Sequence, residues 1–482
     1  MLSLSRFILG VSLYSALASC QTTPFDPREA SIASIHNALF SRLTTCRDVV
    51  TAHIARIEAY NPLINAIITI NPEALSIADE FDDALASGNA TGALFCIPVL
   101  LKDNYDALPM VTTGGCAALN ASTPTLDGPA VTALRRAGAV ILGKANLHEL
   151  ALEGLSVSSY GGQTINSYDS ARTPGGSSGG SGAAIAASLA VLGTGSDTVN
   201  SLRSPASANS LYSFRPTWGL ISRAGVVPIS YTQDTIGAMG RSLMDIATAL
   251  TVMAGVGYDP ADNATAKIPA SVKDTDYTLA LSPSSAPALS SLRIGVLLGF
   301  FNFTSGPDVD PVNAAMTQVL SVLSSSGATL INITDTSTYN ATAISSAMDV
   351  QQLEYREALT AYLSSSNLTG PRPQSMPELY LNTSEYLVIP SQYSYVNNAL
   401  ISSTSNSSYA AKQRLITNLT TTLHSLFASN DLDAIIYPEQ KNLVVPIGSP
   451  SQSGRNGILA ALTGSPVITM PVASVIRATQ RQ

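Results

Sequence analysis

The sequence predicts a layered α/β fold, and three features of the chain support this prediction. Apolar residues recur at the three- and four-residue spacing of amphipathic helices through residues 28–90. Short apolar runs typical of buried strands follow at 97–101 and 140–142. Such alternation of helices with apolar strands is characteristic of a sheet covered by helices. Neither an internal repeat nor a long linker interrupts the sequence, so we expect a single domain over residues 21–482.

The remaining expected elements follow from local composition. A helix is expected over residues 129–138, immediately before the strand at 140–142. The Gly/Ser run 175–182 leads into residues 183–192, which are small or apolar almost throughout and predict a helix buried on all sides. Another helix is expected over residues 243–253.

The first twenty residues have the pattern of a secretory signal peptide. Arg6 is their single charge, residues 7–17 are apolar, and small residues at 16–18 offer a cleavage site. The apolar part is too short to span a bilayer, and no later stretch reaches about 18 uninterrupted apolar residues. We therefore expect a secreted protein without stable membrane insertion; the alternative for residues 1–20 is a buried N-terminal helix.

Ten Asn-x-Ser/Thr sequons agree with export, because glycosylation at such sites takes place in the secretory pathway. They are absent between residues 121 and 262, which indicates that this stretch forms the interior of the fold. Residues 255–292 and 360–410 are rich in Ser, Thr, Asn and Pro, and we expect surface excursions there, not a second core. The sequon asparagines, all candidate glycosylation sites, are Asn89, Asn120, Asn263, Asn302, Asn332, Asn340, Asn367, Asn382, Asn406 and Asn418.

The four cysteines also fit an oxidising compartment. Cys20 lies at or before the expected cleavage point. Cys96 and Cys116 flank a short segment, and we expect a disulfide between them. Cys46 is then left single and is expected to be a buried thiol.

Charge and histidine content narrow the partners and cofactors. The net charge of −8 and the absence of any Lys/Arg run give no electrostatic support for binding nucleic acid. The histidines are scattered and show no metal-ligand spacing, so we expect neither a metal nor an organic cofactor. The sequence leaves the oligomeric state open. The four histidines are His36, His53, His148 and His424.

The Gly-rich run 175–182 allows three interpretations. A phosphate cradle is excluded, because the lysine of the Gly-x4-Gly-Lys-Ser/Thr motif and the dinucleotide-binding spacing are both missing. A nucleophile elbow matches Gly-x-Ser-x-Gly twice, but it needs an apolar strand before it and a histidine after it. Residues 168–174 are not such a strand, and His424 is the only downstream histidine.

The third interpretation is a family resemblance. Residues 175–181 (GGSSGGS) resemble the defining core of the amidase signature family, and other blocks follow in that family's order. The resemblance is dense from about residue 30 to 255, with a signature core over about 95–255, and implies an α/β/α sandwich around a large mixed sheet. It also implies hydrolysis of a linear carboxylic amide. The other blocks are 97–103 (IPVLLKD), 143–149 (GKANLHE), 195–206 (GSDTVNSLRSPA), 215–219 (RPTWG), 233–237 (QDTIG), 433–438 (DAIIYP) and 462–466 (LTGSP).

The resemblance implies a Ser–Ser–Lys triad. Ser201 matches the nucleophile and Lys102 the base, while Ser177 matches a bridging serine held by a cis peptide, here expected at Gly176–Ser177. A serine hydroxyl needs a nearby proton acceptor to attack an amide. A lysine serves only if burial lowers its pKa, and Lys102 ends an apolar strand, where burial is expected. Ser178, Asp197 and Arg203 are expected to support this site.

The sequence departs from the family in two places. Val199 and Asn200 precede the nucleophile where most members have two glycines. The backbone N–H groups of Thr198, Val199, Asn200 and Ser201 are expected to form the oxyanion hole, provided that no positive φ is required at positions 199 and 200. The chain also stops at Gln482, where the family continues, so we expect it to lack a C-terminal strand and helix.

Two alternatives to amide hydrolysis remain. The same site chemistry cleaves esters, which makes an esterase the second enzymatic hypothesis. The Val-Asn pair and the short C-terminus favour a secreted, catalytically silent binding protein. The family's reactions range from the hydrolysis of small aliphatic amides, peptide amides and fatty acid amides to glutaminyl transamidation on transfer RNA, and the last is disfavoured for an exported acidic chain. We expect a small-molecule amide as substrate.

Overall fold

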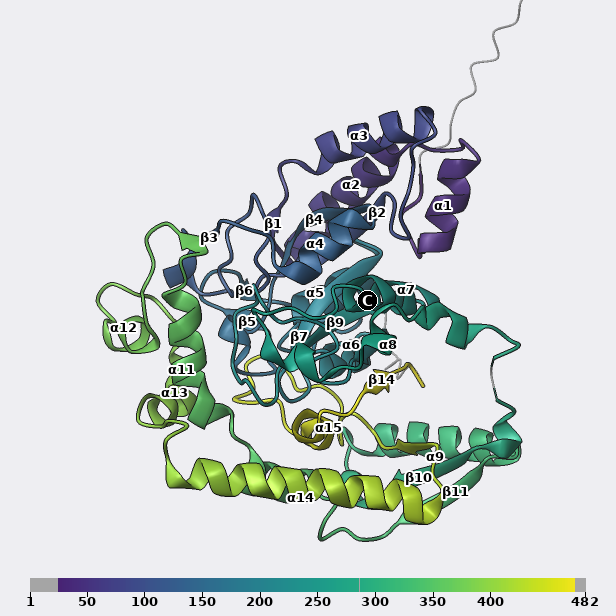
Figure 1. The fold of residues 1–482 in the computed structure, drawn as a ribbon, viewed down its shortest axis with the longest axis vertical. Coiled ribbons are helices and arrows are strands. Elements are labelled where there is room, and N and C mark those ends of the chain that lie inside the picture. Colours follow the sequence, from purple (N-terminus) through teal and green to yellow (C-terminus); the bar gives the residue numbers. More distant parts are fainter. Residues whose placement is uncertain (1–24, 286, 473–482) are drawn as a thin grey trace, which may run out of the picture.

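A seven-stranded mixed sheet forms the centre of the protein in a computed structural model that describes residues 25–285 and 287–472 (Figure 1). β2 runs parallel to both β4 and β7, whereas the pairs β1–β4, β7–β9, β9–β8 and β8–β14 are antiparallel. The predicted α/β fold with a large mixed sheet is confirmed. In spatial order the strands are β1 (Ile67–Ile70), β4 (Ala139–Ala145), β2 (Ile97–Lys102), β7 (Leu192–Asp197), β9 (Thr235–Gly240), β8 (Tyr212–Arg215) and β14 (Val467–Thr469).

Helices of the first half pack on this sheet in two groups. One group contains α2 and α5, with α6 beside α5; the other contains α4 and α7. Ser31 and Thr45 begin the first two helices with reciprocal capping hydrogen bonds, and Pro129 begins α4, a position where proline loses no helical hydrogen bond. The helices are α1 (Ile32–Phe40), α2 (Cys46–Ile64), α3 (Ala74–Ala86), α4 (Pro129–Arg136), α5 (Gly179–Ala186), α6 (Arg203–Ala208) and α7 (Leu243–Ala254).

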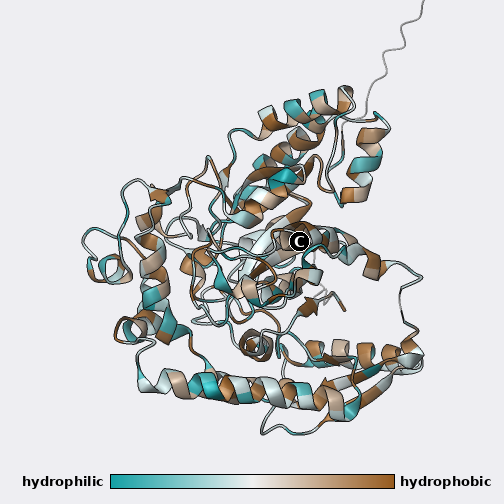
Figure 2. Ribbon diagram, in the orientation of Figure 1, coloured by the Kyte–Doolittle hydropathy of each residue, from teal (hydrophilic) through white to brown (hydrophobic). Residues whose placement is uncertain are grey.

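The second half adds a small parallel sheet, β11-β10-β13, and further helices. The long helix α14 alternates between hydrophilic and hydrophobic residues (Figure 2), and it buries Ile416, Leu419 and Leu423, which lie on one face. The elements are α8 (Ala270–Lys273), β10 (Arg293–Leu297), α9 (Asp310–Ser325), β11 (Thr329–Ile333), α10 (Ala341–Met348), α11 (Gln351–Leu363), α12 (Met376–Leu381), α13 (Tyr393–Leu400), α14 (Ser407–Asn430), β13 (Ala434–Ile436) and α15 (Ile458–Thr463). Two short pairs complete the strands: β3 (Thr123–Pro124) with β12 (Leu368–Thr369), and β5 (Val157–Ser158) with β6 (Gly162–Gln163).

The helices expected at 129–138 and 243–253 and the strands at 97–101 and 140–142 are confirmed. The helix expected over 183–192 is wrong in its extent. α5 ends at Ala186, Ser188 adopts a positive φ of 57°, and residues from Leu192 onward form the central strand β7. An apolar run does not by itself distinguish a buried helix from a buried strand.

The expectation of surface excursions without a second core over 360–410 is also wrong. Helices α11, α12 and α13 pack with residues of the first half, such as Leu150, in a separate apolar cluster in which Tyr355, Met376, Tyr380 and Val396 are buried. The Ser, Thr, Asn and Pro residues that dominate the composition of residues 360–410 lie between these apolar positions in the sequence. Each of the ten sequon asparagines is exposed or half-buried.

The predictions for the two chain ends lie outside the described residues. Residues 1–24 include the expected signal peptide and Cys20, and residues 473–482 follow β14. Within residues 25–472 as described, no helix has the length and apolar character needed to cross a membrane.

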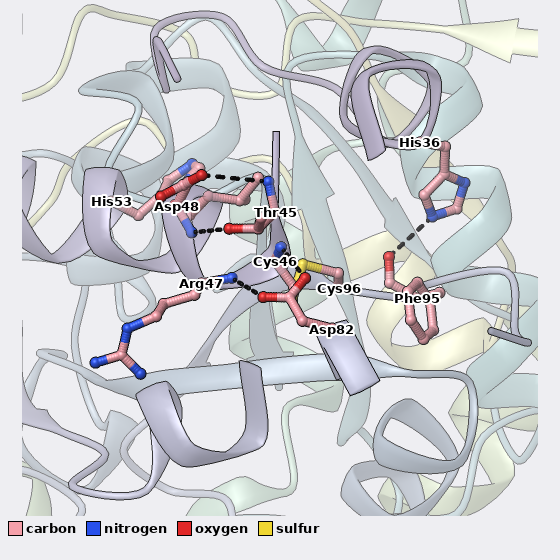
Figure 3. Close-up of a disulfide and its surroundings, with 10 residues drawn as sticks. His36, Thr45, Cys46, Arg47, Asp48, His53, Asp82, Phe95 and Cys96 are labelled. Atoms are coloured by element: carbon pink, nitrogen blue, oxygen red, sulfur yellow. Dashed lines mark hydrogen bonds between the residues drawn. A yellow bond between two sulfur atoms is a disulfide. The ribbon is translucent and has the colours of Figure 1, made fainter. Parts of the chain in front are cut away.

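The disulfide joins Cys46 to Cys96, so the expected Cys96–Cys116 pairing is wrong (Figure 3). The Cα atoms of Cys46 and Cys96 lie 5.7 Å apart, where α2 begins beside the start of β2. β2 then carries the chain about 20 Å away from Cys96, at about 3.3 Å per residue. Cys116 is a buried free thiol beside the α11–α13 cluster, where burial raises the pKa of its thiol.

Removing this disulfide is expected to destabilise the protein. The bond closes a loop across 50 residues, so replacing both Cys46 and Cys96 by alanine should lower the free energy of unfolding by about 2–4 kcal/mol. Denaturant unfolding measures the change. Adding reductant should lower the free energy of unfolding by the same amount in the wild type and in Cys116→Ala. It should leave the double variant, which has no disulfide to reduce, unchanged. Equal stability of the double variant and the wild type would contradict the pairing.

Candidate active site

The parallel strands β2 and β7 place their carboxyl ends at the same edge of the sheet. Lys102 is the last residue of β2 and Asp197 the last of β7. All residues of both strands are buried, and the Lys102 backbone N–H donates to Thr194 Oγ1 at 3.1 Å. The carboxyl edge of parallel strands is where open α/β sheets bind ligands, and the predicted site residues gather here.

The Lys102 amino group is fully buried and faces two hydroxyl groups. Its Nζ lies 2.7 Å from Ser177 Oγ and 2.8 Å from Ser196 Oγ. Burial lowers the pKa of Lys102 to about 7, although Asp197 and Asp234 act in the opposite direction. No carboxylate lies within ion-pair distance of Nζ in the described chain. Lys102 is therefore able to lose its proton near neutral pH and to accept one from a hydroxyl.

The Gly-rich run brings Ser177 to this lysine. The Gly176–Ser177 peptide bond is cis, as expected. Gly175 has a positive φ of 71°, and a Cβ on Gly180 would lie 2.2 Å from the Asn146 carbonyl oxygen, so both positions require glycine. The nucleophile-elbow interpretation is wrong, because no strand precedes the run and His424 is an exposed residue of α14.

Ser201 lies on the loop between β7 and α6. The Ser178 backbone N–H donates to the Ser201 carbonyl oxygen at 3.3 Å, which joins this loop to the Gly-rich run. Ser201 keeps 8% of its surface exposed, whereas Ser177 is fully buried. Among the described residues, no hydrogen-bond partner holds the Ser201 hydroxyl. This hydroxyl is therefore not committed to another protein group, and Ser201 lines a cavity.

The loop before Ser201 presents its backbone N–H groups without a protein partner. Neither Val199 nor Asn200 has a positive φ, so side chains are tolerated where the family has glycines. The N–H groups of residues 198–201 donate to no acceptor in the described chain, yet Thr198, Asn200 and Ser201 are all buried. Unpaired N–H groups on buried residues are rare in proteins, and three of them in one loop, with the half-buried Val199 between, are the arrangement expected of an oxyanion hole.

A buried ion network holds this loop. Arg203 Nε lies 3.1 Å and Arg215 Nη1 3.0 Å from the Asp197 carboxylate, and none of the three side chains is exposed. Burial would raise the pKa of Asp197, but the two guanidinium groups outweigh it and lower the pKa to about 2. Asp197 also accepts from the Leu202 N–H at 3.1 Å, and Arg203 donates to the Val199 carbonyl oxygen. The expected Asp197–Arg203 contact is present.

A cavity of about 460 Å³ opens onto Ser201. One wall carries an ion pair, with Arg455 Nη1 3.1 Å from Glu153 Oε1. The lining combines the loop 198–201 with residues from the second half of the chain. The lining residues are Ala151, Leu152, Glu153, Thr198, Val199, Asn200, Ser201, Ala341, Thr342, Ser345, Ser346, Asp349, Gln351, Tyr395, Gln452, Gly454, Arg455 and Ile458.

The sequence interpretation missed several residues of this site. Ser196 bonds Lys102 and accepts from Asn104 Nδ2 at 3.0 Å. Arg215 is the second guanidinium on Asp197. Ser196 lies in the recognised block 195–206 and Arg215 in the block 215–219. Membership of these blocks was the sequence signal that could have identified them as site residues. The walls from residues 341–351 and 452–458 carry no comparable motif.

Sequence comparison gives a family and several curated relatives. The family described as Amidase matches residues 48–478. A glutamyl-tRNA(Gln) amidotransferase subunit of Azoarcus sp. (strain BH72) is 40% identical over 292 residues, which are 60% of this chain and 58% of that protein. Its counterpart in Microcystis aeruginosa is 37% identical over 305 residues, 63% of this chain and 60% of that one. The chain thus matches less than two thirds of the length of these relatives.

Solved structures match over more of the chain. A peptide amidase from Stenotrophomonas maltophilia superposes with a TM-score of 0.81 at 31% identity, covering 93% of this chain and 91% of that one. The corresponding glutamyl-tRNA(Gln) amidotransferase subunit of Thermotoga maritima superposes with a TM-score of 0.68 at 22% identity, covering 92% and 88%, which bears on the fold alone.

Proposed function

Because this chain belongs to the amidase family, we propose that it hydrolyses a linear carboxylic amide through an acyl-enzyme on Ser201. The observation that carries the proposal is the buried Lys102 amino group, 2.7 Å from Ser177 Oγ and without a carboxylate partner in the described chain. A neutral amine beside a hydroxyl is a general base in position. The hydrogen bond from the Ser178 N–H to the Ser201 carbonyl oxygen, which joins the two loops, supports the choice of Ser201 as nucleophile.

In the proposed reaction, Ser177 relays protons between Ser201 and Lys102. Ser201 Oγ attacks the amide carbon, its proton moves to Ser177, and the Ser177 proton moves to Lys102 Nζ. When the tetrahedral intermediate collapses, the same relay runs in reverse and protonates the departing amine. Water then attacks the acyl-enzyme through the same groups, which releases the carboxylic acid and restores neutral Lys102.

The N–H groups of residues 198–201 are the proposed oxyanion hole. Their charge stabilisation acts where the carbonyl oxygen becomes negative, and one such donor is worth about 3–4 kcal/mol. Asp197, Arg203 and Arg215 are proposed to keep the loop 198–201 in place. Their ion pairs fix the loop before the substrate binds, so the N–H groups need no rearrangement during the reaction. Ser178 supports the same arrangement through its N–H bond to the Ser201 carbonyl.

The dependence of activity on pH follows from Lys102. Only the neutral amine accepts a proton, and burial lowers its pKa to about 7, so kcat/KM should rise with pH and level off above about pH 7. Initial rates measured between about pH 5 and pH 9 test this prediction. A rate that still rises at about pH 9, as it would with a base near the ordinary lysine pKa of about 10.4, would contradict a desolvated base.

Ammonia release from a panel of amides tests the function. The panel should contain small aliphatic amides, glutamine and C-terminal amides of peptides, since the relatives include a peptide amidase and a component of an amidotransferase. The corresponding esters are assayed beside them. Ammonia release is the expected result. Cleavage of esters alone would favour the esterase hypothesis, and a folded protein inactive on both classes would favour the silent binder.

We further propose that the protein is secreted and N-glycosylated. A buried disulfide supports an oxidising compartment, and none of the ten sequon asparagines is buried. Expression with residues 1–20 in a glycosylating host should place the protein in the medium, and peptide N-glycosidase should reduce its mass. Retention inside the cell with residues 1–20 uncleaved would contradict the proposal.

A further inference from the structure

Glu354 is a fully buried carboxylate on α11 that binds one loop of the main sheet. Its Oε1 accepts from Thr232 Oγ1 at 2.5 Å and from the Tyr409 hydroxyl at 2.7 Å. Its Oε2 accepts from the Thr232 N–H at 3.1 Å and from the Ser230 hydroxyl. Glu354 thus holds the loop 229–234, between β8 and β9, against α11 and α14.

The same loop holds the first residue of the proposed oxyanion hole. Asp234 Oδ2 accepts from the N–H groups of Ile229 and Ser230 at 2.8 and 2.9 Å, and its Oδ1 accepts from Thr198 Oγ1 at 2.7 Å. Gln233 Nε2 donates to the Thr198 carbonyl oxygen at 3.3 Å. Thr198 is therefore fixed from two sides by residues of this loop.

Ser230 links the two halves of this network. Its hydroxyl donates to Glu354 and accepts from the Gln233 N–H at 3.1 Å. Gln233 in turn accepts from the Val350 N–H at 3.1 Å, just before α11. A continuous series of hydrogen bonds thus runs from the helices of the second half to Thr198.

We propose that Glu354 is a positioning residue for the oxyanion hole. It fixes loop 229–234 so that Asp234 and Gln233 hold Thr198, and with it the N–H groups that face the substrate carbonyl. This role rests on the proposed function of Ser201. Glu354 contacts neither Ser201 nor the cavity lining at Thr198 directly, and it acts only through the loop. Its effect should therefore fall on the transition state more than on substrate binding.

The chain offers a matched control one helical turn away. Glu357, also on α11, accepts from Ser403 Oγ at 2.7 Å, the Thr404 N–H at 3.0 Å and Thr404 Oγ1 at 2.7 Å. It therefore holds a Ser/Thr loop with the same kinds of donor. Residues 403–404 do not line the cavity at Ser201.

The test compares Glu354→Gln with Glu357→Gln on an amide that the wild type hydrolyses. Glutamine carries an NH2 donor where glutamate has a second acceptor oxygen, so the hydroxyls on that side must reverse their hydrogen bonds and the Thr232 N–H, which cannot reverse, competes for the remaining oxygen. We expect kcat to fall about 10-fold in Glu354→Gln, with KM within about 2-fold of the wild type. Affinity for a boronic acid, which forms a tetrahedral adduct with the serine, should fall in parallel with kcat. Glu357→Gln should leave both values unchanged.

Tyr409→Phe provides a second variant, which removes one donor to Glu354 from a half-buried position. Tyr409→Phe should lower kcat and boronic acid affinity by a smaller factor than Glu354→Gln, without a rise in KM. It replaces Glu354→Gln as the test variant if that protein does not fold. Equal kcat in the Glu354 and Glu357 variants, or a rise in KM alone, would overturn the positioning role. A wild type that releases no product from any amide would instead contradict the proposed function, so the two failures are distinguishable.

Discussion

Ser201→Ala is expected to lower kcat by about 10⁴-fold or more, with little change in KM, because it removes the only proposed nucleophile. The free energy of unfolding should stay close to that of the wild type, since the Ser201 hydroxyl has no hydrogen-bond partner among the described residues. Steady-state rates on the best amide of the panel and denaturant unfolding measure the two quantities.

Ser204→Ala is the matched control for this substitution. Ser204 lies three positions further along the same chain segment, is fully buried, and its Oγ has no partner in the described chain. Activity of Ser204→Ala should stay near that of the wild type. Substantial turnover by Ser201→Ala would contradict the assignment of the nucleophile.

Lys102→Met is expected to lower kcat by about 10³-fold, the scale of a lost general base. It should also abolish the inflection of kcat/KM near pH 7. The unfolding free energy should change by no more than about 2 kcal/mol, because the desolvation of a buried amine is relieved while its two hydrogen bonds to serines are lost. Rates across pH and denaturant unfolding are the measurements.

Lys144→Met separates this effect from the general effect of removing a buried lysine. Lys144 is also fully buried, but its Nζ lies 2.8 Å from Asp103 Oδ1. Removing it leaves a buried carboxylate unpaired, which is expected to cost about 3–5 kcal/mol of stability. Equal losses of stability in the two variants would contradict the view that Lys102 lacks a charge partner.

The sequence could predict those elements of the fold that a local run of residues determines by itself. β2 is an uninterrupted apolar run ending on Lys102, and the Gly-rich run marks where α5 packs against the loop of Asn146. The family resemblance supplied one of the two hydroxyl partners of Lys102, and the structure places this partner, Ser177 Oγ, 2.7 Å from its Nζ. The roles of these residues stay predictions until they are tested.

The rest depended on contacts between distant segments. The apolar run 183–192 contains both a helix end and the start of β7, and only pairing with β2 and β9 distinguishes them. The partner of Cys96 is set by the packing of α2, not by distance along the chain. The cavity walls and Glu354 come from helices of the second half, whose polar composition conceals buried positions.

Mapping the acyl group on the protein tests the central claim most directly. The wild type is mixed with an activated ester or amide, quenched in acid and digested with trypsin. Arg172 and Arg203 are consecutive tryptic sites, so Ser177 and Ser201 lie on the single peptide 173–203. Fragmentation of this peptide must therefore locate the added mass. Acylation of Ser201, absent from Ser201→Ala, is the predicted result. Acylation of Ser177 or Ser178, or turnover without any acyl-enzyme, would contradict the account.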